Sequence, residues 1–315
     1  MSERSALLGT GWRRVLRVAF VLGVVGFAWW GLQGRWREIA GAVAATPALG
    51  LVVASALVLA GLMLTCGAWL RLLAGYGHRL PPGEGRRVFF VGQLGKYIPG
   101  SVWSMGAHAD LARGFGVPVR VTVGTSLAFL GLNVATAGLL ASGLRALGRP
   151  SIPIPEWAGV LGLVVCAVGL TPPVIGRLGT LVAGRTGTLR LGWGAVLHLV
   201  GRMALTWACY AGALVALVPD LEPARLPELF AIAATGFAAA YVVGVAVVVA
   251  PAGVGAREVT LVALLSPAFG LATATAVALV TRLLHTAADL ALGLVSWVRV
   301  RDRVSPRSVS PGRVR

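Results

Sequence analysis

Long uninterrupted apolar blocks constrain this chain more than any other feature of its sequence. Several are about 20 residues long, enough for a helix to cross a hydrocarbon layer about 30 Å thick. Of the 315 residues, 57% are hydrophobic and only 12% are charged, whereas a soluble domain carries about 25% charged residues. A soluble enzyme, a disordered chain and a disulfide-rich secreted module are therefore poor fits. The sequence predicts an all-α, polytopic membrane protein that forms one integral membrane domain over residues 1–315.

Six of the apolar blocks are long enough to be complete membrane spans. We expect them at about 15–33, 48–71, 121–145, 157–176, 192–218 and 271–298. Arginines precede the first block, as they would in a signal peptide. A polar stretch at 33–38 separates this block from any cleavage site, so we expect an uncleaved helix. The cysteines lie singly inside apolar blocks, without metal-ligand spacing, and we assign them no role.

Two further apolar stretches are interrupted by Pro and Gly. The first runs from about 86 to 113 and contains Gly-Lys-Tyr-Ile-Pro-Gly at 95–100; the second runs from about 229 to 266 and contains Pro-Ala-Gly-Val-Gly at 251–255. Pro blocks a helix and Gly lets the chain turn. Unpaired backbone at membrane depth is tolerated only where protein or water covers it. We predict two re-entrant hairpins, although residues 229–250 are alternatively long enough to span the membrane.

Basic residues are distributed unevenly among the predicted loops. The segments 1–17, 71–120, 177–190 and 298–315 together hold 20 Lys and Arg residues, whereas the opposite loops hold 5. Loops rich in Lys and Arg face the cytoplasm in most membrane proteins. We therefore expect both termini to be cytoplasmic, with the basic tail 299–315 acting as an anchor.

The two interrupted stretches align with each other at a single offset. Gly92 corresponds to Gly244 and Pro99 to Pro251, and a predicted span follows each stretch. In the predicted orientation the two units point in opposite directions. This arrangement favours an inverted repeat, as in transporters whose site lies where broken helices meet near the middle of the membrane. The alternative is an accidental alignment in a chain rich in Gly and Val.

Charged residues inside apolar blocks are the candidates for a site, because each costs about 2.5–3.5 kcal/mol on membrane-insertion scales. On the last span, Arg282, His285 and Asp289 share one helical face. Arg282 and Asp289 either line a cavity, where Arg282 meets an anion, or pair internally and fix two helices together. His285 is either a hydrogen-bonding spacer or, with Asp289, a candidate proton carrier.

The two breaks carry charges as well. Arg257 and Glu258 follow the second turn, where the N-terminus of a helix would add positive potential to an anion site. Glu258 is alternatively a simple helix cap. Lys96 is the cation of the first break, or alternatively a lysine that snorkels to the interface.

Other features of the sequence are weaker or absent. It holds no nucleotide-binding loop, metal-ligand cluster or nucleophile elbow, so we expect no enzymatic activity and no cofactor. The weaker polar candidates inside or beside the spans are His198 with Arg202, Asn133, and Asp110 with Arg113.

Three motifs together resemble a known family. Gly-Lys-Tyr-Ile-Pro-Gly-Ser-Val-Trp at 95–103, Pro-Ala-Gly-Val-Gly-Ala-Arg-Glu at 251–258, and Thr281-Arg282 with Asp289 are similar to the lysylphosphatidylglycerol synthase transmembrane-region family. The resemblance covers about residues 15–300. It implies a flippase-like translocase of the bacterial cytoplasmic membrane for anionic or aminoacylated phospholipids, or for polyprenyl-linked lipids. The lipid headgroup-binding residues that it implies are Lys96, Pro99, Gly100, Gly253, Arg257, Glu258, Arg282 and Asp289.

Two departures limit what the resemblance implies. Larger members carry a fused aminoacyltransferase domain that this sequence lacks, so lipid synthesis is not expected. The second turn also reads Pro-Ala-Gly where the family often has Pro-Gly-Gly. The expected partner is a phosphate-bearing lipid and no nucleic acid. Two alternatives remain, namely a non-transporting accessory subunit of a lipid- or glycan-modifying membrane enzyme, and a transporter of small solutes or ions.

Overall fold

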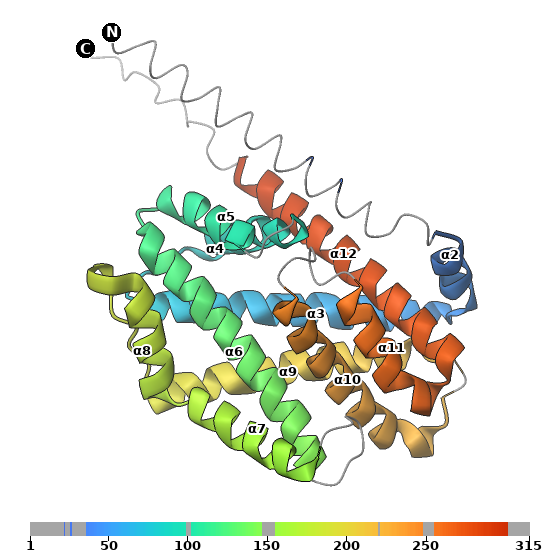
Figure 1. Ribbon diagram of the computed structural model, residues 1–315. Helices are drawn as coiled ribbons and strands as arrows, with labels where there is room; N and C mark the ends of the chain where they lie inside the picture. Colours follow the sequence, from blue (N-terminus) through green and yellow to red (C-terminus); the bar gives the residue numbers. More distant parts are fainter. Residues whose placement is uncertain are drawn as a thin grey trace, which may run out of the picture.

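The computed structural model describes residues 22, 26, 36–98, 102–146, 155–219, 221–247 and 255–301, and these parts contain helices and no strand (Figure 1). Five helices are long and apolar enough to cross a membrane. They are α3 (Ala48–Gly75), α6 (Val119–Ala146), α9 (Trp193–Ala216), α10 (Leu226–Ala246) and α12 (Leu271–Arg301). The structure is thus that of a multi-pass membrane protein.

These helices can be compared with the predicted spans. The predictions at 48–71, 121–145, 192–218 and 271–298 are confirmed as helices long and apolar enough to span. Helix α10 resolves the region around 229–250, which the sequence left open, into a helix that is also long enough. The block at 15–33 lies outside the described residues, apart from two positions.

The predicted span at 157–176 is broken in the structure, and it is long and apolar enough to cross a membrane only if its two helices are counted together. The chain there forms α7 (Glu156–Gly169) and α8 (Pro172–Ala183), which meet at a bend of 64°. Pro172 and Pro173 cannot donate the backbone hydrogen bonds that would continue α7. Thr171 precedes them in an extended conformation, with φ −73° and ψ 146°, as residues before proline prefer. Its hydroxyl donates to the carbonyl of Val168, which closes the end of α7.

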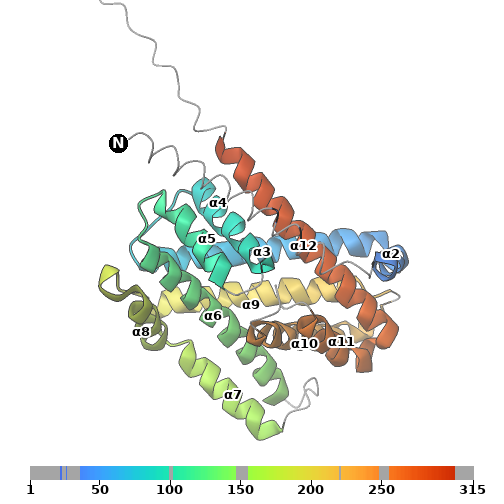
Figure 2. The same cartoon turned by 45° about the horizontal axis from the view of Figure 1, so that its top comes forward.

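Helices α3 and α9 form a central pair that runs in opposite directions across the molecule (Figures 1 and 2). Glycines on α3 let the two helices approach closely. A Cβ on Gly61 would overlap the ring of Tyr210, and a Cβ on Gly67 would overlap the guanidinium of Arg202. The large side chains of α9 therefore lie directly on the α3 backbone.

The first interrupted stretch forms two short helices, α4 (Pro82–Gln93) and α5 (Val102–Arg113), which pack against each other. The 3₁₀ helix η1 (Leu94–Tyr97) extends α4, and residues 99–101 lie outside the described residues. A Cβ on Gly95 would lie 2.6 Å from the backbone nitrogen of Ser104, so only glycine allows η1 to pack on α5.

A buried hydrogen-bond chain fixes this helix pair to the rest of the molecule. Trp69 Nε1 donates to Ser126 Oγ at 3.2 Å, and Ser126 Oγ lies 3.3 Å from His108 Nδ1. His108 Nε2 lies 3.1 Å from the carbonyl oxygen of Phe89. Because a carbonyl only accepts, Nε2 carries the proton and Nδ1 accepts from the serine hydroxyl. The chain links α3, α4, α5 and α6 with every member satisfied.

The second interrupted stretch forms α10 and α11 (Ala256–Phe269), which also pack against each other. Residues 248–254 between them lie outside the described residues, so the predicted turn residue Gly253 does too, as do Pro99 and Gly100 of the first turn. Gly255 adopts a φ of +87° immediately before α11, a conformation that favours glycine.

The helices of the two interrupted stretches correspond in number and packing. A shift of 152 residues moves Val119, the start of α6, onto Leu271, the start of α12, and moves α4 and α5 onto α10 and α11. Helix α4 packs on α12, and α10 packs on α6; α5 packs on α6, and α11 packs on α12. The remaining described elements are α2 (Trp36–Ala45), η2 (Gly184–Thr186) and η3 (Pro223–Arg225).

Candidate anion site between the two helix breaks

Helix α12 presents one polar face to both helix breaks. Arg282, His285 and Asp289 lie on this face, and seven residues of helix separate Arg282 from Asp289, about 10.5 Å along the axis. The first break contacts this face at Asp289, and the second contacts it at Arg282. The structure therefore gathers the charged candidates of both breaks along a single helix.

Asp289 binds the first break through two contacts. Lys96 Nζ lies 2.6 Å from Asp289 Oδ2, and the Tyr97 hydroxyl donates to the same oxygen at 2.8 Å. The Asp289 side chain is only 3% exposed, whereas that of Lys96 is 32% exposed. Lys96 thus points inward to a buried carboxylate, and the snorkelling interpretation of Lys96 does not describe this conformation.

Glu258 joins the second break to α12. Its Oε1 accepts from Arg282 Nη1 at 3.0 Å, and its Oε2 accepts from the backbone N–H of Gly255 at 2.6 Å. The second contact makes Glu258 the cap of α11, as the capping interpretation expected. Arg282 pairs with Glu258 and Asp289 with Lys96, so the predicted alternative of an internal Arg282–Asp289 pair is not what forms.

The charged residues along α12 and at the two breaks, namely Lys96, Glu258, Arg282 and Asp289, form a cluster that we call the centre. Arg257 is its third cation. Its guanidinium carbon lies 4.5 Å from the centre of the Phe237 ring, a cation–π contact. Among the described residues no carboxylate lies within 4.0 Å of Arg257, and the side chain is half-buried. Three cations therefore face two carboxylates in this part of the molecule, and the unbalanced charge sits on Arg257.

His285 lies beside the same aromatic ring. Its ring stacks on Phe237 at 5.5 Å between centres and meets Tyr210 edge-on at 4.9 Å. Nδ1 lies 2.9 Å from the carbonyl oxygen of Thr281 and donates to it, because that oxygen only accepts. Nε2 is buried and has no hydrogen-bond partner in the described part of the chain. The neutral ring thus offers one unused lone pair inside the centre.

Four aromatic side chains form a wall of this centre, and the sequence analysis did not single them out. They are Trp207, Tyr210, Phe237 and Tyr241. Tyr210 of α9 and Phe237 of α10 lie 5.1 Å apart, and Trp207 lies 5.3 Å from Tyr241. The spacing of Phe237 and Tyr241, four residues apart on one helix face, was a usable signal. Alone, however, it does not distinguish a site wall from ordinary helix packing.

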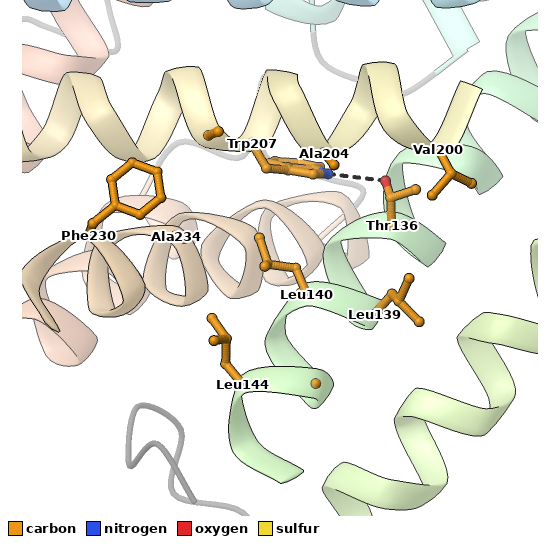
Figure 3. Close-up of a pocket in the computed structure, with 11 residues that line it drawn as sticks. Thr136, Leu139, Leu140, Leu144, Val200, Ala204, Trp207, Phe230 and Ala234 are labelled. Carbon is orange, nitrogen blue, oxygen red and sulfur yellow. Dashed lines mark hydrogen bonds between the residues drawn. The ribbon is translucent and has the colours of Figure 1, made fainter. Parts of the chain in front are cut away.

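An apolar groove of about 350 Å³, lined in part by Trp207, lies between α6, α9 and α10 (Figure 3). Its lining includes Leu139, Leu140 and Phe230, and Trp207 Nε1 donates to Thr136 Oγ1 at 3.1 Å along one wall. The groove carries no charged side chain among its lining residues. It therefore suits a hydrocarbon chain better than a polar solute.

The weaker polar candidates do not join this centre. Asn133 Nδ2 donates to the carbonyl of Phe129 on its own helix at 2.7 Å. Asp110 and Arg113 form no ion pair within 4.0 Å in the described structure. Arg202 lies against Gly67 of α3.

The described residues contain no group of three or more His, Cys, Asp or Glu side chains placed to hold a metal ion. No protein-family model matches the chain, and no curated protein matches it either. What the site can do must therefore be argued from its own geometry. A half-buried guanidinium with an excess positive charge, beside an aromatic wall and an apolar groove, is suited to bind an anion attached to an apolar group.

Proposed function

We propose that this protein is a flippase-like lipid translocase of the lysylphosphatidylglycerol synthase transmembrane-region family, in the bacterial cytoplasmic membrane with both termini cytoplasmic. One observation carries the proposal, namely the Arg257 guanidinium with no carboxylate within 4.0 Å in the described chain. A cation inside a membrane protein requires compensation. The phosphate of a lipid headgroup supplies it.

The chemistry of the centre favours phosphate in particular. Guanidinium binds phosphate through two parallel hydrogen bonds, a geometry that a lysine ammonium does not offer. The carboxylates of Glu258 and Asp289 neutralise Arg282 and Lys96, so the centre stays close to neutral once one anion occupies it. The acyl chains would remain in apolar surroundings such as the groove beside Trp207.

Movement of the headgroup between leaflets requires two alternating states. We propose that α4–α5 and α10–α11 are re-entrant hairpins of an inverted repeat whose halves rock against each other, as in other transporters with broken helices. The reciprocal packing of α4 on α12 and α10 on α6, and the opposite directions of α3 and α9, support this proposal (Figure 2).

Leaflet-resolved translocation in proteoliposomes tests the function. The purified protein is reconstituted with fluorescent phosphatidylglycerol, phosphatidylethanolamine or phosphatidylcholine, and the label in the outer leaflet is quenched chemically over time. We expect the wild-type protein to move the anionic lipid. Arg257→Gln should slow it about tenfold, because a hydrogen bond to a charged group contributes about 1.5–3 kcal/mol.

Arg225→Gln is the matched control, because it removes the same charge from an exposed position in η3. This variant should translocate at the wild-type rate. Equal rates for wild type and folded Arg257→Gln would contradict the assignment of the site. No translocation of any headgroup by folded wild-type protein would contradict the function and favour an accessory subunit.

A further inference from the structure

Helix α8 lies across one end of the helix bundle. Its direction crosses that of α3 and α9, at the end where α3 finishes and α9 begins (Figures 1 and 2). A Cβ on Gly179 would lie 2.6 Å from the hydroxyl oxygen of Tyr76, the residue that follows α3. Thr180 Oγ1 accepts a hydrogen bond at 3.2 Å from the backbone N–H of Leu189, which lies shortly before α9. These contacts fix one face of α8 against the end of the bundle.

A second face of α8 is apolar and exposed. The side chains of Leu178 and Leu181 are 59% and 78% exposed, and Val182 beside them is exposed as well. Residues spaced three and four positions apart lie on the same side of a helix, so these three side chains form one apolar strip. Such side chains favour apolar surroundings over water. The strip therefore needs a partner that offers hydrocarbon.

Exposed arginines lie on and beside the same helix. Arg177 belongs to α8 and Arg185 to η2, directly after it, and both are exposed. Arg120, in the first turn of α6, is also exposed and reaches the end of α8, where its Nη1 lies 3.6 Å from the position of a Cβ on Gly184. Within the described parts of the chain, none of these three arginines has a carboxylate within 4.0 Å. This end of the bundle thus carries an excess of positive charge next to the apolar strip.

Neither water nor hydrocarbon alone suits this surface. Water disfavours the exposed leucines, and hydrocarbon disfavours the arginines. The membrane interface accommodates both, because apolar side chains reach the acyl chains while arginine side chains extend to the phosphates. Helix α7 agrees with this level: Val160 and Val164 on its outer side are exposed and face hydrocarbon, and the 64° bend at its end turns the chain into α8.

We propose that α8 is an in-plane helix that docks on an anionic leaflet of the membrane. Leu178 and Leu181 lie among the acyl chains of this leaflet. Arg120 and Arg185 lie at the level of the lipid phosphates, which guanidinium groups bind through two parallel hydrogen bonds. A negatively charged headgroup is favoured over a zwitterionic one, because the surface presents cations without neighbouring carboxylates. The segment after α7 is then an interfacial anchor that joins two spans.

The depth of α8 in the membrane is the first test. The full-length protein carries a nitroxide at Leu178→Cys or Leu181→Cys in vesicles of phosphatidylglycerol and phosphatidylcholine, and its collisions with oxygen and with a water-soluble nickel chelate are measured by electron paramagnetic resonance. We expect oxygen to dominate at both positions, at a depth of about 5–10 Å. Val164→Cys on α7 is the reference for hydrocarbon, and unsubstituted protein measures the background from native cysteines. Dominant nickel collisions overturn the proposal, and so do few collisions with either reagent, because a protein would then cover the strip.

The preference for anionic lipid is the second test. Phosphatidylglycerol with a diazirine next to its phosphate is cross-linked to the reconstituted protein, and labelled chymotryptic peptides from 174–190 are quantified by mass spectrometry. Excess phosphatidylglycerol should suppress this labelling more strongly than phosphatidylcholine does. Arg120→Gln and Arg185→Gln should each reduce it about fivefold, the effect of about 1 kcal/mol per basic residue at a lipid surface. Arg225→Gln removes an exposed charge from η3 and should leave it unchanged.

The outcomes separate this proposal from the proposed function, on which it does not depend. Unchanged labelling in both Arg120→Gln and Arg185→Gln overturns it, as does equal competition by phosphatidylcholine. Both arginines are exposed, so their removal leaves the packing of α8 intact. Arg257→Gln should keep the wild-type labelling even where it abolishes translocation. Loss of labelling in folded Arg257→Gln would overturn the assignment, because the labelled lipid would then belong to the centre.

Discussion

The ion pair between Lys96 and Asp289 gives the sharpest prediction of stability. Asp289 is 3% exposed and accepts from both Lys96 and Tyr97, whereas Lys96 is 32% exposed. Removal of one partner of a buried pair costs about 3–5 kcal/mol, because the other charge stays buried without compensation. Lys96 is partly exposed and Tyr97 still donates, so we expect Lys96→Met to lower the free energy of unfolding by about 2 kcal/mol.

Removal of the other partner, in Asp289→Leu, should lower the free energy of unfolding by less than Lys96→Met does. Asp289→Leu leaves the lysine, whose long side chain can turn its ammonium toward water or the interface. The double variant removes both charges, and replacement of a buried pair by apolar residues is often neutral. We therefore expect the double variant to lie within about 1 kcal/mol of wild type, with a coupling of about 2 kcal/mol in the double-mutant cycle.

The free energy of unfolding is measured for wild type, the two single variants and the double variant. Each protein is unfolded reversibly in mixed micelles with increasing amounts of a denaturing detergent, and the transition is followed by tryptophan fluorescence and by circular dichroism. The transitions need to coincide between the two probes before free energies are compared. Additive effects of the two single substitutions would refute the reasoning, because they would mean that the two charges do not interact. A Lys96→Met protein with the same free energy of unfolding as wild type would refute the reasoning as well.

Two further predictions concern packing. A Cβ on Gly92 would overlap the ring of His108, which hydrogen bonds hold in place, so Gly92→Ala should destabilise the protein by about 1–3 kcal/mol in the same unfolding assay. Gly83→Ala, on the same helix with open space around it, should not; equal losses in both variants would contradict this account. Thr136→Val deprives buried Trp207 Nε1 of its acceptor and should cost about 1–3 kcal/mol, so an unchanged transition would mean that another group replaces the threonine.

The sequence was sufficient to predict four of the five long apolar helices, namely α3, α6, α9 and α12, and the polar face of α12. Apolar length predicts spans because the bilayer fixes it, and the spacing of Arg282, His285 and Asp289 predicts one face because helical periodicity is local. The bend between α7 and α8 was also visible in principle, since Pro172 and Pro173 interrupt that block.

The partners of those charges could not be predicted in the same way. Tyr97 and Asp289 are 192 residues apart, and nothing local to either residue identifies the other. Arg282 had two carboxylates as possible partners, and only the packing of α11 on α12 selects Glu258. The role of Gly92 likewise depends on His108, a residue with no distinctive sequence context.

The two ion pairs differ in what a rocking motion would do to them. In the proposed inverted repeat, Glu258 and Arg282 would belong to the same half, on α11 and α12, so their contact could persist while the halves move as rigid bodies. Lys96 and Asp289 would belong to different halves of that repeat, on η1 and α12, so movement of one half against the other would stretch or break their contact. An anionic headgroup that attracts Lys96 competes directly with Asp289 for that ammonium. Substrate binding would then weaken the contact that holds the halves together, which couples occupancy of the site to the motion that translocation needs.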